Sequence, residues 1–228
     1  MSTCPHHPLR PDVQPPPKFM QHLPVDKRGY PVPWFVDWQN GEPEFRAMDM
    51  RKFRAAINNN LCWTCGRGLR PSEEVFVIGP MCAVNRISSE PPSHRECARY
   101  SAVNCPFLSK PHMVRRADEK FSAEKKPAAG IMVERNPGVT LLWFTRKHNL
   151  LNAPYRPGLS AAGVLFQIGK PFATEWYRHG RPATRAEVIE AIESGLPILR
   201  ETSAKYDGPD AVTLLENQIT HAMRLVPR

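Results

Sequence analysis

The chain has 228 residues, of which 41% are hydrophobic and 23% are charged, and its formal net charge is +9. This composition is typical of a globular protein, and no segment approaches the ~20 apolar residues that a membrane-spanning helix needs. The proline-rich start of the chain contains histidines and cannot serve as the apolar part of a signal peptide. We therefore expect a cytoplasmic protein that makes no contact with a membrane.

The basic excess lies in the first two thirds of the chain. Residues 111–160 contain nine Lys and Arg against four Asp and Glu, whereas residues 161–228 contain eight of each kind. A basic surface attracts anionic partners such as nucleic acid, although many basic proteins bind none. The charge therefore permits a nucleic-acid partner without requiring one.

We expect residues 1–29 to form an extended arm. Prolines recur along it and include the run Pro15–Pro17, which favours polyproline-like backbone over a regular helix. Such an arm can lie on the surface or wrap around the domain.

Residues 30–113 are predicted to form a hairpin followed by a zinc module. Asn40-Gly41 is a strong turn signal, and Asp49 is a good cap for the helix that follows it. The predicted elements are a hairpin over 30–48, a helix over 50–58 and a strand over 75–79.

A charged connector over residues 114–130 is predicted to lead into a small antiparallel sheet and C-terminal helices over 131–228. The expected strands are 131–133, 139–145 and 164–168, of which the first two flank a turn and are predicted to pair. Helices are predicted to start at the capping box Thr184–Glu187, to stop at Gly195, to restart at Pro197 and to break at Gly208-Pro209.

The strongest chemical signal is a pair of short cysteine motifs. In the reducing cytoplasm, cysteine spacing is better tested against metal ligands than against disulfides. Two ligand pairs, each with two residues between its members, can close a tetrahedron around Zn2+. The predicted ligands are Cys62, Cys65, His94 and Cys97.

The local sequence predicts how each pair is held. Gly66 directly follows the first pair, as in a zinc knuckle, where a tight turn needs relaxed backbone angles. The pattern from Ser93 to Glu96 fits a capping box, which makes Ser93 the predicted N-cap of a helix that carries the second pair in its first turn.

Knuckle, strands and helix in this order resemble a treble-clef zinc finger. The predicted fold class is therefore α+β, with a treble-clef-like zinc module, short antiparallel strands and C-terminal helices. An ordinary buried role for the cysteines is the competing interpretation.

The remaining cysteines leave alternatives open. Cys4, His7, Cys82 and Cys105 can form a second zinc site if the arm folds back, or the last two are simply buried. Cys82 can also replace His94 in the first site.

Catalysis by the zinc is not favoured. Glu96 lies between two ligands, as a general base could, but a thiolate-rich set of four ligands leaves no open position. The treble clef is also the frame of HNH-type nucleases, yet the strand 75–79 has no histidine where that family carries its general base. Asn85 and His112 are weak substitutes, so an HNH-like nuclease remains only the alternative.

The string from Phe76 to Arg86, together with residues 90–94 and 105–108, resembles a family of uncharacterised bacterial and phage-associated proteins. The resemblance extends to residues 28–35 and 180–184. It implies a phage or mobile-element setting and no particular activity.

The leading hypothesis is a zinc-stabilised binding protein that contacts nucleic acid or a protein partner. Guanidinium groups pair well with phosphate oxygens. The candidate phosphate contacts are Arg86, Arg95, Arg99, Arg115 and Arg116. A purely structural adaptor is the other alternative, with Trp34, Phe35 and Trp38 as its contact patch or as core.

Overall fold

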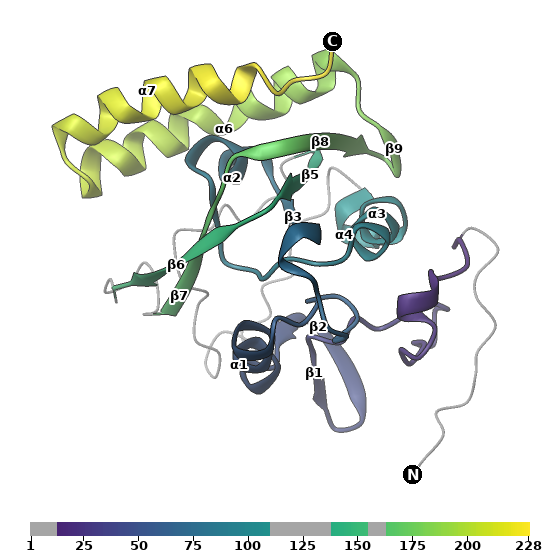
Figure 1. Ribbon diagram of the computed structural model, residues 1–228. Coiled ribbons are helices and arrows are strands. Elements are labelled where there is room, and N and C mark those ends of the chain that lie inside the picture. Colours follow the sequence, from purple (N-terminus) through teal and green to yellow (C-terminus); the bar gives the residue numbers. More distant parts are fainter. Residues whose placement is uncertain (1–12, 110–137, 155–162) are drawn as a thin grey trace.

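The structure is a computed structural model that describes residues 13–109, 138–154 and 163–228. Within these ranges, helices combine with antiparallel sheets, which confirms the predicted α+β class (Figure 1). In the same part of the chain, no helix combines the length and apolar content that a bilayer span requires. The predicted connector over 114–130 lies outside the described residues.

The elements have the following bounds. In chain order they are η1 (Lys18–Met20), β1 (Val36–Gln39), β2 (Glu42–Met48), α1 (Met50–Asn59), η2 (Pro71–Glu73), β3 (Glu74–Ile78), α2 (Pro80–Asn85), β4 (Ile87–Ser88), α3 (Arg95–Asn104), α4 (Pro106–Ser109), β5 (Thr140–Thr145), β6 (His148–Ala153), β7 (Gly163–Ile168), β8 (Pro171–Arg178), β9 (Arg181–Pro182), α6 (Arg185–Tyr206) and α7 (Pro209–Met223).

The first hairpin and helix are present, but the first strand starts at Val36 and not at residue 30 as predicted. β1 and β2 pair around Asn40 and Gly41, whose φ angles of 51° and 80° suit a tight hairpin turn. Asp49 caps α1, because its carboxylate accepts a hydrogen bond from the backbone N–H of Arg51.

Two antiparallel sheets form the centre of the molecule. The larger has the strand order β3-β5-β8-β9 and the smaller the order β4-β7-β6. β5 pairs with β3 along one edge and with β8 along the other. The pairing predicted for 139–145 was with 131–133, which lie outside the described part of the chain; the pairing of β5 with β3 and β8 was not predicted.

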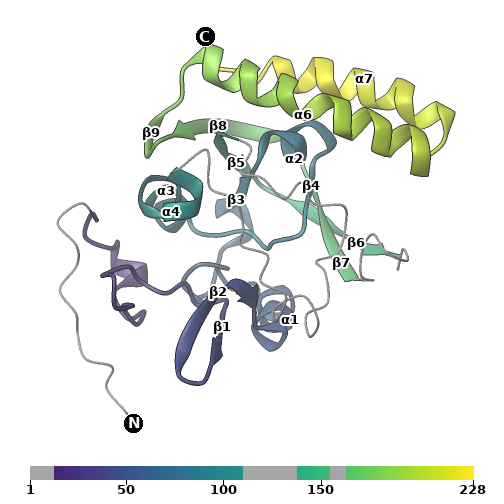
Figure 2. The ribbon, with the colours of Figure 1, turned by 180° about the vertical axis from the view of Figure 1, so that it is seen from behind.

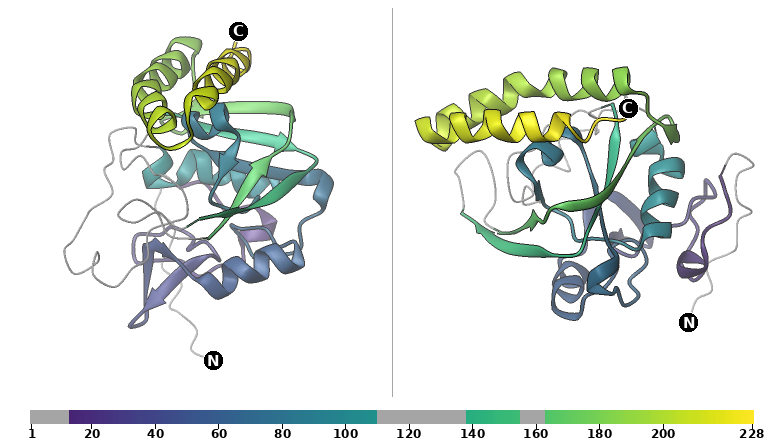
Figure 3. Two further views of the ribbon diagram at one scale, coloured as in Figure 1. Left: turned by 90° about the vertical axis from the view of Figure 1, so that its left-hand side faces the viewer. Right: turned by 45° about the horizontal axis from the view of Figure 1, so that its top comes forward.

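The larger sheet is covered on both faces. One face packs against α2, α6 and α7, where Phe76, Trp143 and Trp176 join the main hydrophobic core. Ala98 and Ala102 of α3 pack on the other face. Helices α6 and α7 lie side by side at one end of the molecule, whereas α1 and the β1–β2 hairpin lie at the opposite end (Figures 1 and 2). The same arrangement is visible in the turned views of Figure 3.

The C-terminal helices differ from the prediction at one point. The capping box between Thr184 and Glu187 is present, and Gly208, with a φ of 89°, precedes α7 as predicted. However, α6 continues through Gly195 and Pro197, which were expected to separate two helices. Gly195 is instead a packing position, because a Cβ there would lie 2.7 Å from the sulfur of Met81 on α2.

Glycines in two similar hairpin turns provide a test of how α3 packs against the turn at Gly180. Gly180 and Gly41 have φ angles of 71° and 80°, but only at Gly180 would a Cβ collide with backbone, 2.7 Å from the carbonyl oxygen of Val103. We expect Gly41→Ala to lower the free energy of unfolding by about 1 kcal/mol through backbone strain alone. Gly180→Ala should cost about 2–4 kcal/mol, because the collision adds to that strain. Urea unfolding measures the free energy of unfolding of each variant. An equal loss of stability in the two variants would show that α3 does not pack against the turn at Gly180.

Candidate metal centre

Four buried side chains converge on one point. The Sγ atoms of Cys62, Cys65 and Cys97 and a ring nitrogen of His94 all lie within 4.8 Å of one another. All three cysteine residues are 0% exposed and His94 is 5% exposed. Ligand atoms around tetrahedral zinc lie roughly 3.5–3.8 Å apart, given Zn–S and Zn–N bonds of about 2.3 and 2.0 Å. The cluster therefore has the donor set and compactness of a Cys3His metal site, and His94 rather than Cys82 completes it.

The first pair is held by a tight knuckle. Gly66 donates its backbone N–H to the carbonyl oxygen of Cys62 at 2.8 Å, and Cys62 donates to the carbonyl oxygen of Arg67 at 2.8 Å. Gly66 has a φ of 73°, and a Cβ there would lie 2.6 Å from the ring of Trp34. Only glycine suits both this backbone angle and this close contact.

The second pair is held by the start of α3, but not through the predicted cap. His94 is the N-cap residue, and no side chain caps this helix end. Ser93 is still extended, since it exchanges backbone hydrogen bonds with Val75 at 2.8 and 3.1 Å. Its hydroxyl instead contacts the hydroxyl of Thr64 at 2.8 Å and accepts a hydrogen bond from the backbone N–H of Thr64. Ser93 thus ties the two ligand pairs together, and Glu96 is exposed and outside the cluster.

A hydrogen bond fixes which nitrogen of His94 faces the sulfur atoms. Nε2 lies 3.0 Å from the carbonyl oxygen of Gly68, which can only accept, so Nε2 carries the proton. In the neutral ring, Nδ1 is then left with a free lone pair 3.4 Å from the sulfur of Cys65. This is the arrangement that metal-binding histidines adopt, with the second nitrogen oriented by a carbonyl group.

The electrostatics of the cluster favour a bound cation. Burial opposes the ionisation of Cys62, but its contacts with Cys65, Cys97 and His94 outweigh burial and lower its pKa. Contacts with Cys62 and Cys65, together with burial, raise the pKa of Cys97. Burial lowers the pKa of His94, yet the two thiols beside it raise the value to about 10. Three thiolates and a neutral imidazole can coexist here only around a positive ion.

The N-terminal arm covers the cluster. Phe19 stacks on the ring of His94, with 4.4 Å between the ring centroids and 8° between the planes. His22 donates through Nε2 to the carbonyl oxygen of Cys65 at 3.0 Å. Met20 and Leu23 are buried against the cysteines. The sequence predicted a surface or wrapping arm, but gave no signal for this contact.

The order of elements around the cluster is that of a treble clef. The knuckle is followed by β3, which meets Ser93 in an isolated antiparallel bridge, and α3 then begins. In place of a short hairpin turn, α2 and β4 lie between β3 and Ser93 and contribute to the main core and the smaller sheet.

The other predicted metal ligands are not tested. Cys4 and His7 lie outside the described residues. Burial raises the pKa of Cys82 to about 11 and also raises that of Cys105, so both are protonated thiols at neutral pH. The second zinc site stays a prediction.

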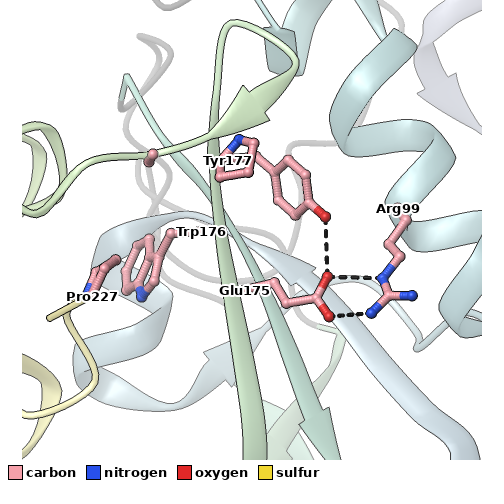
Figure 4. Close-up of a pocket in the computed structure, with 7 residues that line it drawn as sticks. Arg99, Glu175, Trp176, Tyr177 and Pro227 are labelled. Carbon is pink, nitrogen blue, oxygen red and sulfur yellow. Dashed lines mark hydrogen bonds and ion pairs between the residues drawn. The ribbon is translucent and has the colours of Figure 1, made fainter.

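The predicted phosphate contacts have different surroundings. Arg86 and Arg95 are exposed, and the guanidinium of Arg95 lies 5.3 Å from the ring centroid of Phe144. The guanidinium of Arg99 donates two hydrogen bonds to the carboxylate of Glu175, and the hydroxyl of Tyr177 donates to the same carboxylate at 3.0 Å (Figure 4). Arg115 and Arg116 lie outside the described residues. Arg95 is therefore the most available of the predicted cations near the cluster.

Other predicted functional residues serve the fold. The side-chain oxygen of Asn85 accepts a hydrogen bond from the backbone N–H of Ile87, and His112 lies outside the described residues. Of the predicted aromatic contact patch, Trp34 and Phe35 are half-buried against the main core, where Phe35 stacks on Trp63 at 4.8 Å, and Trp38 is 37% exposed.

Comparisons of the chain with protein families, with curated proteins and with solved structures found no match.

The arm provides a test of the cluster's environment. Phe19→Ala removes the ring that stacks on His94, and we expect zinc to pass to a competing coloured chelator about tenfold faster than from the unaltered chain. Phe45→Ala is the matched control, because Phe45 is 40% exposed against 38% for Phe19 and lies in β2, outside the cluster. Equal release rates for the two variants would contradict a protective role for the arm.

Proposed function

We propose that the protein is a zinc-stabilised binding protein in which Cys62, Cys65, His94 and Cys97 hold one structural zinc ion. The observation that carries the proposal is the closed, buried set of three sulfur atoms and one imidazole nitrogen within 4.8 Å. Zinc accepts such a soft tetrahedral set, and a site with four protein ligands has no position for a substrate or water. Bound there, zinc would contribute folding free energy.

Nucleic acid is the partner that we propose. The formal net charge of +9 supports it, as does Arg95, an exposed cation in the first turn of the helix that carries Cys97. The HNH-like alternative receives no such support, because β3 contains no histidine and the side chain of Asn85 is already hydrogen-bonded. The phage or mobile-element setting has no observation behind it and forms no part of the proposal.

Metal content tests the zinc assignment directly. By elemental mass spectrometry, the unaltered chain should carry one zinc ion, and Cys62→Ser and Cys97→Ser should lose it. Both variants should also lose several kcal/mol of stability, which is part of the roughly 10–16 kcal/mol that zinc binding supplies to small zinc modules. Cys82→Ser is the matched control, since Cys82 lies outside the cluster and should leave the zinc content unchanged.

Full zinc occupancy in Cys97→Ser would overturn the ligand assignment. Loss of one of two zinc ions in Cys82→Ser would show that the predicted second site exists.

A further inference from the structure

A second surface, separate from the cysteine cluster, combines basic and aromatic side chains. We call it the basic ridge, and it consists of Arg95, Arg146, Lys147, Lys170 and Phe172, with Phe144 beneath. Residues 145–147, Lys170 and Phe172 line an open hollow of about 610 Å³. The four cations are exposed, and Phe172 is 49% exposed.

The hollow is preorganised by a buried hydroxyl. Thr145 is 0% exposed, and its Oγ1 lies 3.0 Å from the carbonyl oxygen of Lys147 and 3.1 Å from that of Lys170. The backbone N–H of Gly169 also donates to the carbonyl oxygen of Lys147 at 3.1 Å. Two turns that are distant in sequence are thus joined, so their lysines are held near each other before any ligand arrives.

A β-bulge places Phe172 on the ridge. Phe144 pairs with Ala173 and Thr145 with Pro171, which leaves Phe172 as the extra residue. An extra residue in a strand redirects its side chain. The ring of Phe172 accordingly contacts that of Phe144, with centroids 6.2 Å apart, and the guanidinium of Arg146 lies 5.6 Å from its centroid.

The ridge reaches the metal centre through Arg95. Its guanidinium lies 5.3 Å from the centroid of Phe144, the ring that Phe172 touches. Arg95 directly follows His94, so the cluster fixes the start of α3 and with it one end of the ridge.

The neighbouring carboxylates have partners of their own. Glu74, opposite Thr145 in the sheet, contacts Nδ1 of His148 at 2.8 Å. Glu175 is paired with Arg99, and Glu73 lies 3.8 Å from Arg70. Each of these three carboxylates therefore has a hydrogen-bond or ion-pair partner outside the ridge.

We infer that the basic ridge binds single-stranded nucleic acid, with a base stacked on Phe172 and phosphates paired with Arg146, Lys147, Lys170 and Arg95. The inference rests on the proposed nucleic-acid function and names its surface. Exposed aromatic rings between cations are how proteins bind unpaired strands, because every base has a face that can stack. A duplex hides those faces and would gain only from the cations.

Fluorescence anisotropy of the zinc-loaded chain with a labelled oligothymidylate of roughly 12 nucleotides tests this inference. Phe172→Leu keeps an apolar contact with Phe144 but removes the stacking surface, so we expect about tenfold weaker binding with an unchanged salt slope. Lys147→Gln and Lys170→Gln should each reduce the slope of log K against log salt by about 0.7.

Two control variants match these changes. Phe45→Ala removes another exposed ring that has an arginine, Arg28, 5.0 Å from its centroid. Arg54→Gln removes an exposed charge on α1. Both should bind like the unaltered chain.

The binding experiment distinguishes failure of the nucleic-acid proposal from failure of the inference about the ridge. No binding of the oligonucleotide at about 50 mM salt would overturn the nucleic-acid proposal as a whole. Binding that the ridge variants do not weaken would overturn the ridge alone. Tighter binding of a duplex, or equal competition by polyglutamate, would show that the surface attracts negative charge without stacking a base, and would also overturn it.

Discussion

Three cysteine sulfur atoms and an imidazole nitrogen share a buried space in which they lie within 4.8 Å of one another, and the surrounding structure depends on how their charges are balanced. Buried thiolates repel one another and are poorly solvated, so the group is stable in its ionised form only around a cation. The knuckle, the start of α3 and the arm all meet at this point. A zinc ion there would add metal bonds to the hydrogen bonds and ring contacts that already join these three segments.

Helix α3 connects this centre to the rest of the molecule. Its first turn follows His94 and contains Cys97, while Ala98 and Ala102 pack on the larger sheet. Because β3 and β5 belong to that sheet, the position of the zinc module is coupled to the strands that carry Thr145 and the turn beyond it. In the proposed function, the metal centre therefore orders the basic ridge and makes no contact with the nucleic acid.

The sequence predicted the features that depend on local chemistry. The ligand spacing, the Asn40-Gly41 turn and the Thr184 capping box need only neighbouring residues, and all three are found as expected. Predictions failed where tertiary contacts decide: Gly195 looked like a helix end but accommodates Met81. Ser93 looked like a helix cap but bonds Thr64. The contact of Phe19 with His94, and that of the Thr145 hydroxyl with the carbonyl oxygen of Lys170, join residues far apart in sequence and leave no local pattern.

X-ray absorption at the zinc edge of the purified 228-residue chain would show the ligands of the metal directly. A closed structural site predicts three sulfur neighbours at about 2.3 Å and one nitrogen neighbour at about 2.0–2.1 Å. Two or fewer sulfur neighbours, or additional oxygen ligands from water, would contradict the account, because the site would then be open or built from other residues.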